Sequence, residues 1–266
     1  MIKISYKTPI IYFFGCAILT LATSFKNSPQ KNASISANDK LKVIVIDAGH
    51  GGKDPGAVGK LSREKDIALQ VALKLGKKIE ANLAGVKVVY TRKSDTFPKL
   101  YERPALANKN KADLFISIHL NAGGSASGTE TFVLGYNSMV NQDAAIRENA
   151  SILLEDNHED NYGGFDPKDP SSYIVFKLMK RQYRDRSIKL AKYIQAEYSS
   201  QGRVNRGIKE LPLAVLKTAA MPAVLTEIGF ISNSREEKYM LSADGQAEIV
   251  NNLFNAIKKY KTSTEK

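Results

Sequence analysis

Residues 41–47 read LKVIVID, a short and nearly continuous apolar run in which valine and isoleucine predominate. Such a run is typical of a β-strand that is buried on both faces, as in a parallel sheet. A glycine-rich turn follows, and apolar residues then recur at every fourth position from 67 to 83. This period predicts an amphipathic helix that ends before Gly85. The fold is therefore expected to begin with a strand, a turn and a helix.

The alternation of strands and helices continues along the chain. Further strands are predicted at residues 86–91, 113–119 (DLFISIH), 129–134 and 221–229 (MPAVLTEIG), and further helices at 100–110 and 250–260. Strands that alternate with helices indicate a parallel sheet with right-handed crossovers. The predicted fold class is α/β: a single, mostly parallel, twisted sheet of about six strands with helices on both faces, plus a helical insertion.

The pattern also divides the chain into parts. Residues 1–24 carry two lysines and no acid around an apolar stretch, which predicts a signal peptide for export; an uncleaved membrane anchor is the alternative. Residues 25–40 are polar and without apolar period, as in a flexible linker. Residues 41–262 are expected to form one domain with a helical insertion at about 137–200. After residue 134, sheet pattern is expected to return only near Leu213.

Composition limits the classes of function. The chain has 266 residues, of which 43% are hydrophobic, so disorder throughout is excluded. Its single cysteine, Cys16, rules out an internal disulfide and a cysteine-rich zinc site, so histidines and carboxylates would have to hold any metal. The net charge of +12 favours anionic partners. Nucleic acid is not expected among them, because the basic residues are scattered and the chain carries an export signal.

Two of the three histidines occupy equivalent places. His50 follows the first predicted strand and His119 ends the third, so both are expected at the same edge of the sheet, where ligands bind. One such histidine is more often structural, but the pair indicates a metal site. A catalytic zinc takes three protein ligands, and without cysteine the third should be a carboxylate. Glu64 is a candidate; the alternative is an ordinary acidic residue in the first turn of a helix.

Glu227 interrupts the apolar run of the last predicted strand. A buried carboxylate costs several kcal/mol unless it is paired or used, so Glu227 is expected to face the metal. A glutamate there can take a proton from water and deliver it to a leaving group in metal-assisted hydrolysis. The alternative is a structural ion pair with a basic residue.

Separated motifs occur in one order between residues 41 and 260. They are IDAGHGGKDPGA (46–57), REKD (63–66), TR (91–92), RP (103–104), SIHLNA (117–122), NRG (205–207) and LTEIGFISN (225–233). Together they resemble the zinc-dependent N-acetylmuramoyl-L-alanine amidases of bacterial cell walls, the type 3 amidase family. Ala48 stands where that family usually has proline, a departure that touches no ligand.

The resemblance implies a site and a reaction. It assigns binding of one zinc ion per chain to His50, Glu64 and His119, acid–base catalysis to Glu227, and substrate binding to Asn121 and Arg206. The implied substrate is the amide between the lactyl group of N-acetylmuramic acid and L-alanine of the stem peptide in peptidoglycan. Cell-wall remodelling or daughter-cell separation is the implied role, in the periplasm or cell envelope, with the protein as a monomer. It would contact the membrane only through an uncleaved signal.

The insertion resembles that of Gram-negative division amidases, in which a helical segment covers the site until an activator protein moves it. On the stretch IRENAS (146–151), Glu148 is the candidate for blocking the zinc, and Glu155 is the second choice. A solvated surface helix is the alternative, and His158 is interpreted as a surface residue. A long helix with a basic face is predicted at 172–198.

A catalytically inactive peptidoglycan-binding protein is the alternative to the enzyme. Such a protein would be expected to have lost a zinc ligand or the catalytic acid. The sequence keeps all four residues, which favours the enzyme.

Overall fold

The computed structural model of the protein describes residues 40–135, 142–162, 168 and 183–265. The predicted signal peptide and nearly all of the predicted linker lie outside the described residues, so both stay predictions. Among the helices that are described, none is both long and apolar enough to cross a membrane.

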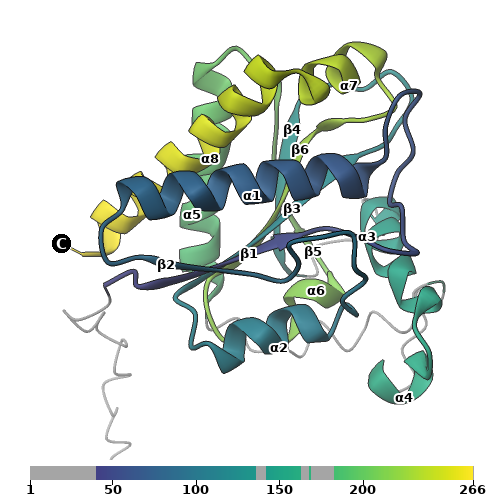
Figure 1. The fold of residues 1–266 in the computed structure, drawn as a ribbon, viewed down its shortest axis with the longest axis horizontal. Helices are drawn as coiled ribbons and strands as arrows, with labels where there is room; N and C mark the ends of the chain where they lie inside the picture. The colour runs from purple at the N-terminus through teal and green to yellow at the C-terminus, as the bar shows by residue number, and fades with distance from the viewer. Residues whose placement is uncertain (1–39, 136–141, 163–167, 169–182, 266) are drawn as a thin grey trace, which may run out of the picture. The chain divides into compact units, whose positions relative to one another are not determined.

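Six strands form one sheet, in the order β2-β1-β3-β6-β4-β5 (Figure 1). They are β1 (Val43–Ala48), β2 (Lys87–Tyr90), β3 (Leu114–Asn121), β4 (Thr129–Leu134), β5 (Asn205–Leu211) and β6 (Ala223–Phe230). Among the described strands, β4 pairs with β6 in the antiparallel direction, and all other neighbours are parallel. The prediction of a mostly parallel sheet of about six strands is confirmed.

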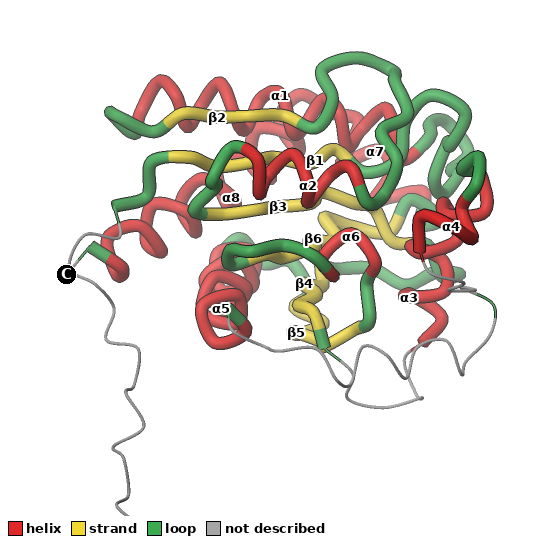
Figure 2. Tube along the Cα trace, turned by 90° about the horizontal axis from the view of Figure 1, so that it is seen from below, coloured by secondary structure: helices red, strands yellow, loops and turns green. Residues whose placement is uncertain are grey.

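Helices cover both faces of the sheet (Figure 2). One face carries α1 (Glu64–Asn82), α5 (Arg184–Ser200), α7 (Ser234–Leu241) and α8 (Ala243–Thr264), and the other carries α2 (Glu102–Lys109) and α6 (Ala214–Lys217). Near the carboxyl ends of β1 and β3 lie α3 (Gln142–Asn149), the 3-10 helix η2 (Ala150–Leu154) and α4 (His158–Tyr162).

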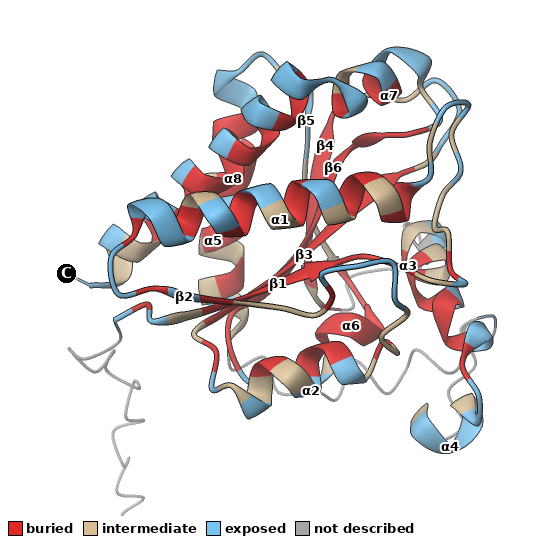
Figure 3. Ribbon diagram, viewed as in Figure 1, coloured by how far each residue is buried: buried red, intermediate tan, exposed pale blue. Residues whose placement is uncertain are grey.

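The sheet separates two hydrophobic cores, which explains the continuous apolar runs in the sequence. On β1, Ile44 and Ile46 belong to the core beneath α1, whereas Val45 belongs to the core beneath α2. All three side chains are fully buried. The strands β1, β3, β4 and β6 are buried along most of their length, and α1 turns its buried side to the sheet (Figure 3). The core beneath α1 contains the side chains at 67, 71, 75 and 79, as their four-residue period predicted.

The structure corrects the prediction at β5. No strand was expected between residue 134 and Leu213, but β5 spans Asn205–Leu211. This strand lies at the edge of the sheet and buries only Leu211, so it has no apolar run to reveal it. The helices α6 and α7 were also not predicted. Of the helix predicted at 172–198, residues 172–182 lie outside the described residues, and α5 begins at Arg184.

Candidate metal centre and active site

His50 lies in the turn after β1 and has a φ of +57°, which is uncommon for a residue other than glycine. Two arginines fix this turn through its backbone carbonyls. Arg92 donates from Nε to Ala48 O (3.0 Å) and from Nη2 to Gly49 O (2.7 Å). Arg103 donates from Nη2 to His50 O (3.0 Å). The separate TR and RP motifs therefore both support the turn that carries His50.

Asp47 lies beneath this turn and is fully buried. Its carboxylate accepts hydrogen bonds from Thr91 Oγ1 (2.6 Å), Ser117 Oγ (2.6 Å) and Arg103 Nη1 (2.8 Å). Burial alone would raise the pKa of Asp47, but the charge of Arg103 and the two hydroxyl bonds outweigh burial and lower it below 3.8. The buried guanidinium of Arg103 thus has a buried counter-charge.

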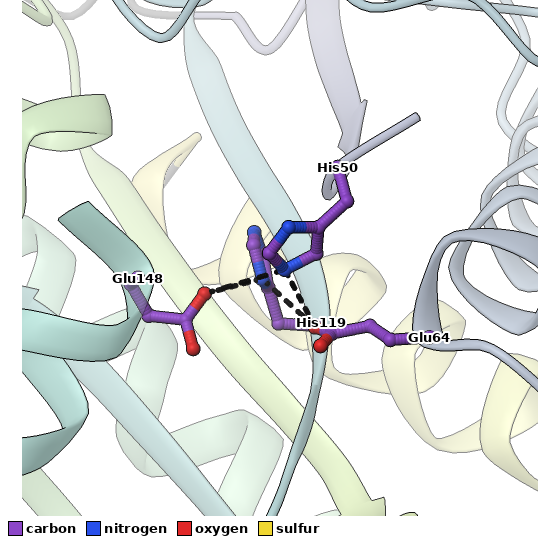
Figure 4. A group of neighbouring side chains, drawn as sticks. All are labelled: His50, Glu64, His119 and Glu148. Carbon is purple, nitrogen blue, oxygen red and sulfur yellow. Dashed lines mark hydrogen bonds and ion pairs between the residues drawn. The ribbon is translucent and has the colours of Figure 1, made fainter. Parts of the chain in front are cut away.

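Four side chains from separate segments point toward one another at this edge of the sheet: His50, Glu64, His119 and Glu148 (Figure 4). Their ligand atoms lie within 4.8 Å of one another, and all four residues are buried. Glu64 Oε1 is 3.1 Å from both His50 Nε2 and His119 Nδ1. Glu148 Oε2 is 2.7 Å from His119 Nδ1 and 3.6 Å from His50 Nε2. The structure therefore brings together the three predicted ligands and the predicted blocking residue.

The donor atoms of this cluster suit a divalent metal ion. His50 Nδ1 lies 2.7 Å from Asp54 Oδ2, an arrangement that places the proton on Nδ1 and a lone pair on Nε2. Nε2 has no hydrogen-bond partner among the described residues, although carboxylate oxygens of Glu64 and Glu148 face it. A lone pair that faces carboxylates is stabilised by a cation between them. Imidazole nitrogens with carboxylate oxygens form a donor set that zinc accepts.

The pKa values of the histidines reflect the same excess of negative charge. Burial disfavours a charged imidazole, but Glu64 and Asp54 outweigh it and hold the pKa of His50 well above its ordinary value. Burial likewise opposes the charged form of His119, and Glu148 together with Glu64 raises the pKa of His119 to about 9. The pocket of carboxylates thus attracts a positive charge, which a proton or a metal ion can supply.

Glu64 is held rigidly at the first residue of α1. Its Oε1 accepts a hydrogen bond from Leu120 N (2.9 Å), and its Oε2 accepts one from Ala57 N (2.8 Å). The neighbouring Gly49 leaves the room that the site needs, because a Cβ atom there would lie 2.5 Å from the His119 ring. The glycine-rich motif before α1 and the first residue of α1 therefore both contribute to the same site.

Glu227 lies on β6 directly beside His119 of β3 and is fully buried. Burial and the nearby charge of Glu148 raise the pKa of Glu227 well above its ordinary value, although Arg147 acts in the opposite direction. Its Oε2 has no hydrogen-bond partner among the described residues. A buried carboxyl group with a raised pKa binds a proton more readily than an exposed one, which suits a general acid or base.

Arg147 connects Glu227 to the cluster. Its Nη2 lies 3.3 Å from Glu227 Oε1 and 3.0 Å from Glu148 Oε1. Its Nη1 is 3.4 Å from the carbonyl oxygen of Ala122. Arg147 of α3 therefore contacts Glu227, the predicted catalytic acid, and the next residue, Glu148, contacts the histidines.

Two more residues attach the same segment to the domain. Ser151 donates from Oγ to Asp54 Oδ2 (2.6 Å), the carboxylate that also holds His50. Asn149 donates from Nδ2 to Pro212 O (2.9 Å) and accepts a hydrogen bond from Ala214 N (2.8 Å). The segment formed by α3 and η2 is thus fixed at the site by several polar contacts.

Glu155, the second choice for the blocking residue, lies elsewhere. It accepts hydrogen bonds from Leu100 N (2.7 Å) and from the hydroxyl of Tyr162 (2.9 Å). It does not belong to the group of possible metal ligands in the described part of the chain. Its contacts hold α4 against the segment that precedes α2.

Asn121 and Arg206, the predicted substrate-binding residues, meet at a different carboxylate. Asn121 Nδ2 donates to Glu130 Oε2 (2.9 Å), and Arg206 Nε donates to Glu130 Oε1 (3.0 Å). Lys209 Nζ also donates to Glu130 Oε1 (2.8 Å). Glu130 is the β4 residue paired with Glu227 of β6, so this second cluster lies next to the first.

Sequence reasoning did not identify several of these residues. Asp54 and Arg147 belong to the motifs quoted above and lie close in sequence to His50 and Glu148. Their positions could therefore have indicated a role in the site. Glu130 and Lys209 carried no such signal. They meet only because β4 and β5 are neighbours in the sheet.

Comparison with known proteins gives consistent matches. The family profile described as N-acetylmuramoyl-L-alanine amidase matches residues 44–259. The N-acetylmuramoyl-L-alanine amidase AmiC of Escherichia coli is 35% identical over 235 residues, which are 85% of this chain and 54% of that protein. The chain thus spans about half the length of this relative.

Solved structures show the same fold. The crystal structure of an N-acetylmuramoyl-L-alanine amidase from Clostridium difficile 630 matches with a TM-score of 0.63 and 29% identity, over 84% of this chain and 98% of that one. The CwlD amidase of Clostridioides difficile, solved in complex with the GerS lipoprotein, matches with a TM-score of 0.61 and 28% identity. That match covers 84% of this chain and 99% of CwlD.

Proposed function

The chain belongs to the N-acetylmuramoyl-L-alanine amidase family, and from this premise we propose that it hydrolyses the amide between the lactyl group of N-acetylmuramic acid and L-alanine in peptidoglycan. The observation that carries the proposal is the convergence of His50, Glu64 and His119, with Glu227 beside them, at one edge of the sheet. A metal site next to a buried carboxyl group is suited to the hydrolysis of an amide.

One zinc ion per chain would be held by His50, Glu64 and His119. When bound, zinc supplies a Lewis acid that polarises a carbonyl oxygen and makes a nearby water more acidic. The chain prepares this site in advance. Asp54 orients His50, and the backbone N–H groups of Leu120 and Ala57 orient the carboxylate of Glu64.

Glu227 would transfer the protons of the reaction. It accepts a proton from the attacking water and returns it to the nitrogen of the departing L-alanine. The second transfer is essential, because the nitrogen would otherwise have to leave as an anion. The raised pKa of Glu227 favours the first transfer, since a carboxylate with an ordinary pKa is a weaker base, and it lets Glu227 hold the proton until the nitrogen takes it.

The segment of α3 and η2 would hold this site in an inactive form. Glu148 contributes a fourth carboxylate or imidazole donor where a zinc enzyme needs an open position. Arg147 pairs with Glu227, so the positive charge stabilises the ionised carboxylate and covers it. A partner protein that removes the segment would release both groups. One relative, the CwlD amidase, forms a complex with another protein, the GerS lipoprotein, which supports a role for a partner.

The biological setting completes the proposal. The enzyme would act as a monomer after export to the periplasm or cell envelope. There it would remodel the wall or separate daughter cells, with peptidoglycan as its substrate. The net charge of +12 is compatible with a wall polymer that carries carboxylates or phosphates.

Purified sacculi test the reaction directly. We would incubate them with the wild-type protein and with the Glu148→Gln variant. Parallel samples would carry Glu227→Gln in addition, and the products would be identified by mass spectrometry. The expected products are free stem peptides that begin with L-alanine. They should be lost with Glu227→Gln and with a chelator, and restored by zinc.

Other products would contradict the proposal. Cleaved glycan bonds or cut cross-links would show a different hydrolase. Binding to sacculi without release of peptides by any variant would show an inactive wall-binding protein.

A further inference from the structure

A cationic cluster lies next to the proposed catalytic centre and has no part in the chemistry described above. Glu130 is 3% exposed and accepts hydrogen bonds from Arg206 Nε and Lys209 Nζ at one oxygen and from Asn121 at the other. Two positive charges thus share one carboxylate. The cluster keeps a net positive charge beside Glu227, to which Glu130 is paired across the sheet.

The two cations keep donors that face outward. The side chain of Arg206 is 38% exposed and that of Lys209 is 31% exposed. Arg206 uses its Nε on Glu130, and in the described part of the chain its two Nη atoms have no hydrogen-bond acceptor. The guanidinium also lies over the ring of Phe230, 5.0 Å from the ring centre. A planar guanidinium that is held at Nε, with both Nη atoms available to donate hydrogen bonds, is suited to bind a carboxylate.

The distance to the catalytic residue fits a peptide. Arg206 Nε and Lys209 Nζ both lie about 3 Å from Glu130 Oε1, and Glu130 is paired with Glu227 across the two strands. Side chains of such a pair start roughly 5 Å apart, so the two cationic groups lie roughly 5–10 Å from the Glu227 carboxyl group. An extended peptide spans about 3.3–3.6 Å per residue. A group that contacts Arg206 and Lys209 would therefore belong to the second or third residue after the bond beside Glu227.

We propose that Arg206 and Lys209 form a subsite that binds a free carboxylate on the second or third residue of the stem peptide. This inference rests on the proposed function, because it takes the scissile amide to lie at Glu227. Glu130 and Asn121 act as positioning residues: the buried carboxylate holds the two cations in place, and Asn121 holds that carboxylate. The subsite would select acidic peptides over peptides whose carboxylates are amidated.

Binding measurements test the subsite without requiring turnover. The zinc-loaded full chain with Glu227→Gln would be titrated by calorimetry with N-acetylmuramoyl tripeptides. These would differ only in whether the second or the third residue carries a free carboxylate or a carboxamide. Amidation at one of the two positions should weaken binding tenfold or more, as expected for the loss of a hydrogen-bonded charge. The titrated protein also carries Glu148→Gln, because Glu148 and Arg147 of α3 otherwise cover the place of the scissile amide. Arg206 and Lys209 are themselves partly exposed with α3 in place.

Substitutions then test whether Arg206 and Lys209 cause the preference for a free carboxylate. Arg206→Gln and Lys209→Met should each reduce the discrimination between acid and amide, and Arg206→Lys should retain part of it. Arg184→Gln is the matched control, because Arg184 pairs with Glu210 of the same strand β5 and is also partly exposed. It should leave the discrimination unchanged. Each variant is compared by its unfolding midpoint, so that a folding defect is recognised.

Equal affinity for all the peptides would overturn the proposal. So would a carboxylate preference that survives both Arg206→Gln and Lys209→Met in variants that fold. Because Glu227→Gln is present throughout, failure to release peptides from sacculi would count against the reaction alone.

Discussion

At the scale of single residues, buried charges organise the site before any ligand binds. Asp47 neutralises Arg103, and Arg103 with Arg92 holds the turn in which His50 has its unusual backbone conformation. Asp54 then sets the proton on His50. These contacts fix the backbone and the ring of His50, whose Nε2 lies within 4.8 Å of ligand atoms from Glu64, His119 and Glu148.

Asp47→Asn should destabilise the protein strongly. The substitution leaves the Arg103 guanidinium buried without its counter-charge, which costs about 3–5 kcal/mol. We would measure the free energy of unfolding by urea at pH 7 on zinc-free protein. Asp66→Asn is the control, because Asp66 forms an exposed pair with Arg63 and should cost less than about 1 kcal/mol.

The same carboxylate gives a pH dependence with a definite sign. The pKa of Asp47 is lower in the folded protein than its ordinary value of 3.8, so the unfolded chain binds a proton first as the pH falls. The stabilisation by Asp47 is therefore fully present well above pH 3.8 and is lost progressively below it. The wild-type protein should lose stability over that range more steeply than Asp47→Asn. Equal slopes would show that Asp47 has no lowered pKa.

At the scale of elements, α3 and η2 combine several different contacts in one short segment. Glu148 approaches the histidines, Arg147 pairs with Glu227, and Ser151 donates to Asp54. The side chains of Ala145 and Ile152 are buried in the core beneath α2. The segment is thus a packed part of the domain, and any displacement of it from the site would have to break these contacts.

Glu148→Gln and Arg147→Met should each raise the rate of peptide release from sacculi, by about tenfold or more for Glu148→Gln. The first removes the extra metal-binding carboxylate, and the second frees Glu227. Deletion of residues 141–170 should raise the rate further. Asp143→Asn, on the exposed side of the same helix, is the control and should change little.

A reduced rate with Glu148→Gln would contradict the inhibitory role. Chelator competition shows whether Glu148 binds the metal directly. If Glu148 is an additional ligand, Glu148→Gln should lower the affinity for zinc while the rate rises.

At the scale of the whole molecule, the order of the strands decides which residues meet. The strands β1, β3 and β6 are parallel neighbours, and the carboxyl ends of all three carry site residues. The antiparallel strand β4 follows β6 and places Glu130 beside Glu227. The candidate metal ligands and the cationic cluster thus lie along one edge of the sheet, although their residues are far apart in the sequence.

Zinc should stabilise the folded protein, because its ligands come from three distant segments that meet only on folding. At 100 times the dissociation constant, a bound ligand adds about 2.7 kcal/mol to the free energy of unfolding. For a domain of this size that raises the melting temperature by roughly 5–10 °C. Calorimetry of the protein with and without zinc measures the shift.

Glu64→Gln should lose most of this shift. Glu155→Gln should keep it, since Glu155 binds Leu100 and Tyr162 and lies outside the cluster. An unchanged shift with Glu64→Gln would show that zinc binds elsewhere.

The sequence by itself determined the α/β class, the first four strands in the chain, β6 and the presence of His50 and His119 at strand ends. These features follow from local periodicity and from the rule that parallel strands end at one edge. The start of a predicted helix and the interruption of an apolar strand also made Glu64 and Glu227 candidates, and motif similarity added Glu148. The structure brings all three to that edge.

Tertiary structure alone decided the rest. The edge strand β5 has no buried period, so its sequence does not distinguish it from a polar segment. The contact of Arg147 with Glu227 joins residues 80 positions apart, and the grouping of Lys209 and Arg206 on Glu130 depends on which strand lies beside β4. Charge pairs of this kind leave no repeat in the sequence, because their partners are chosen by the packing of distant elements and not by neighbours in the chain.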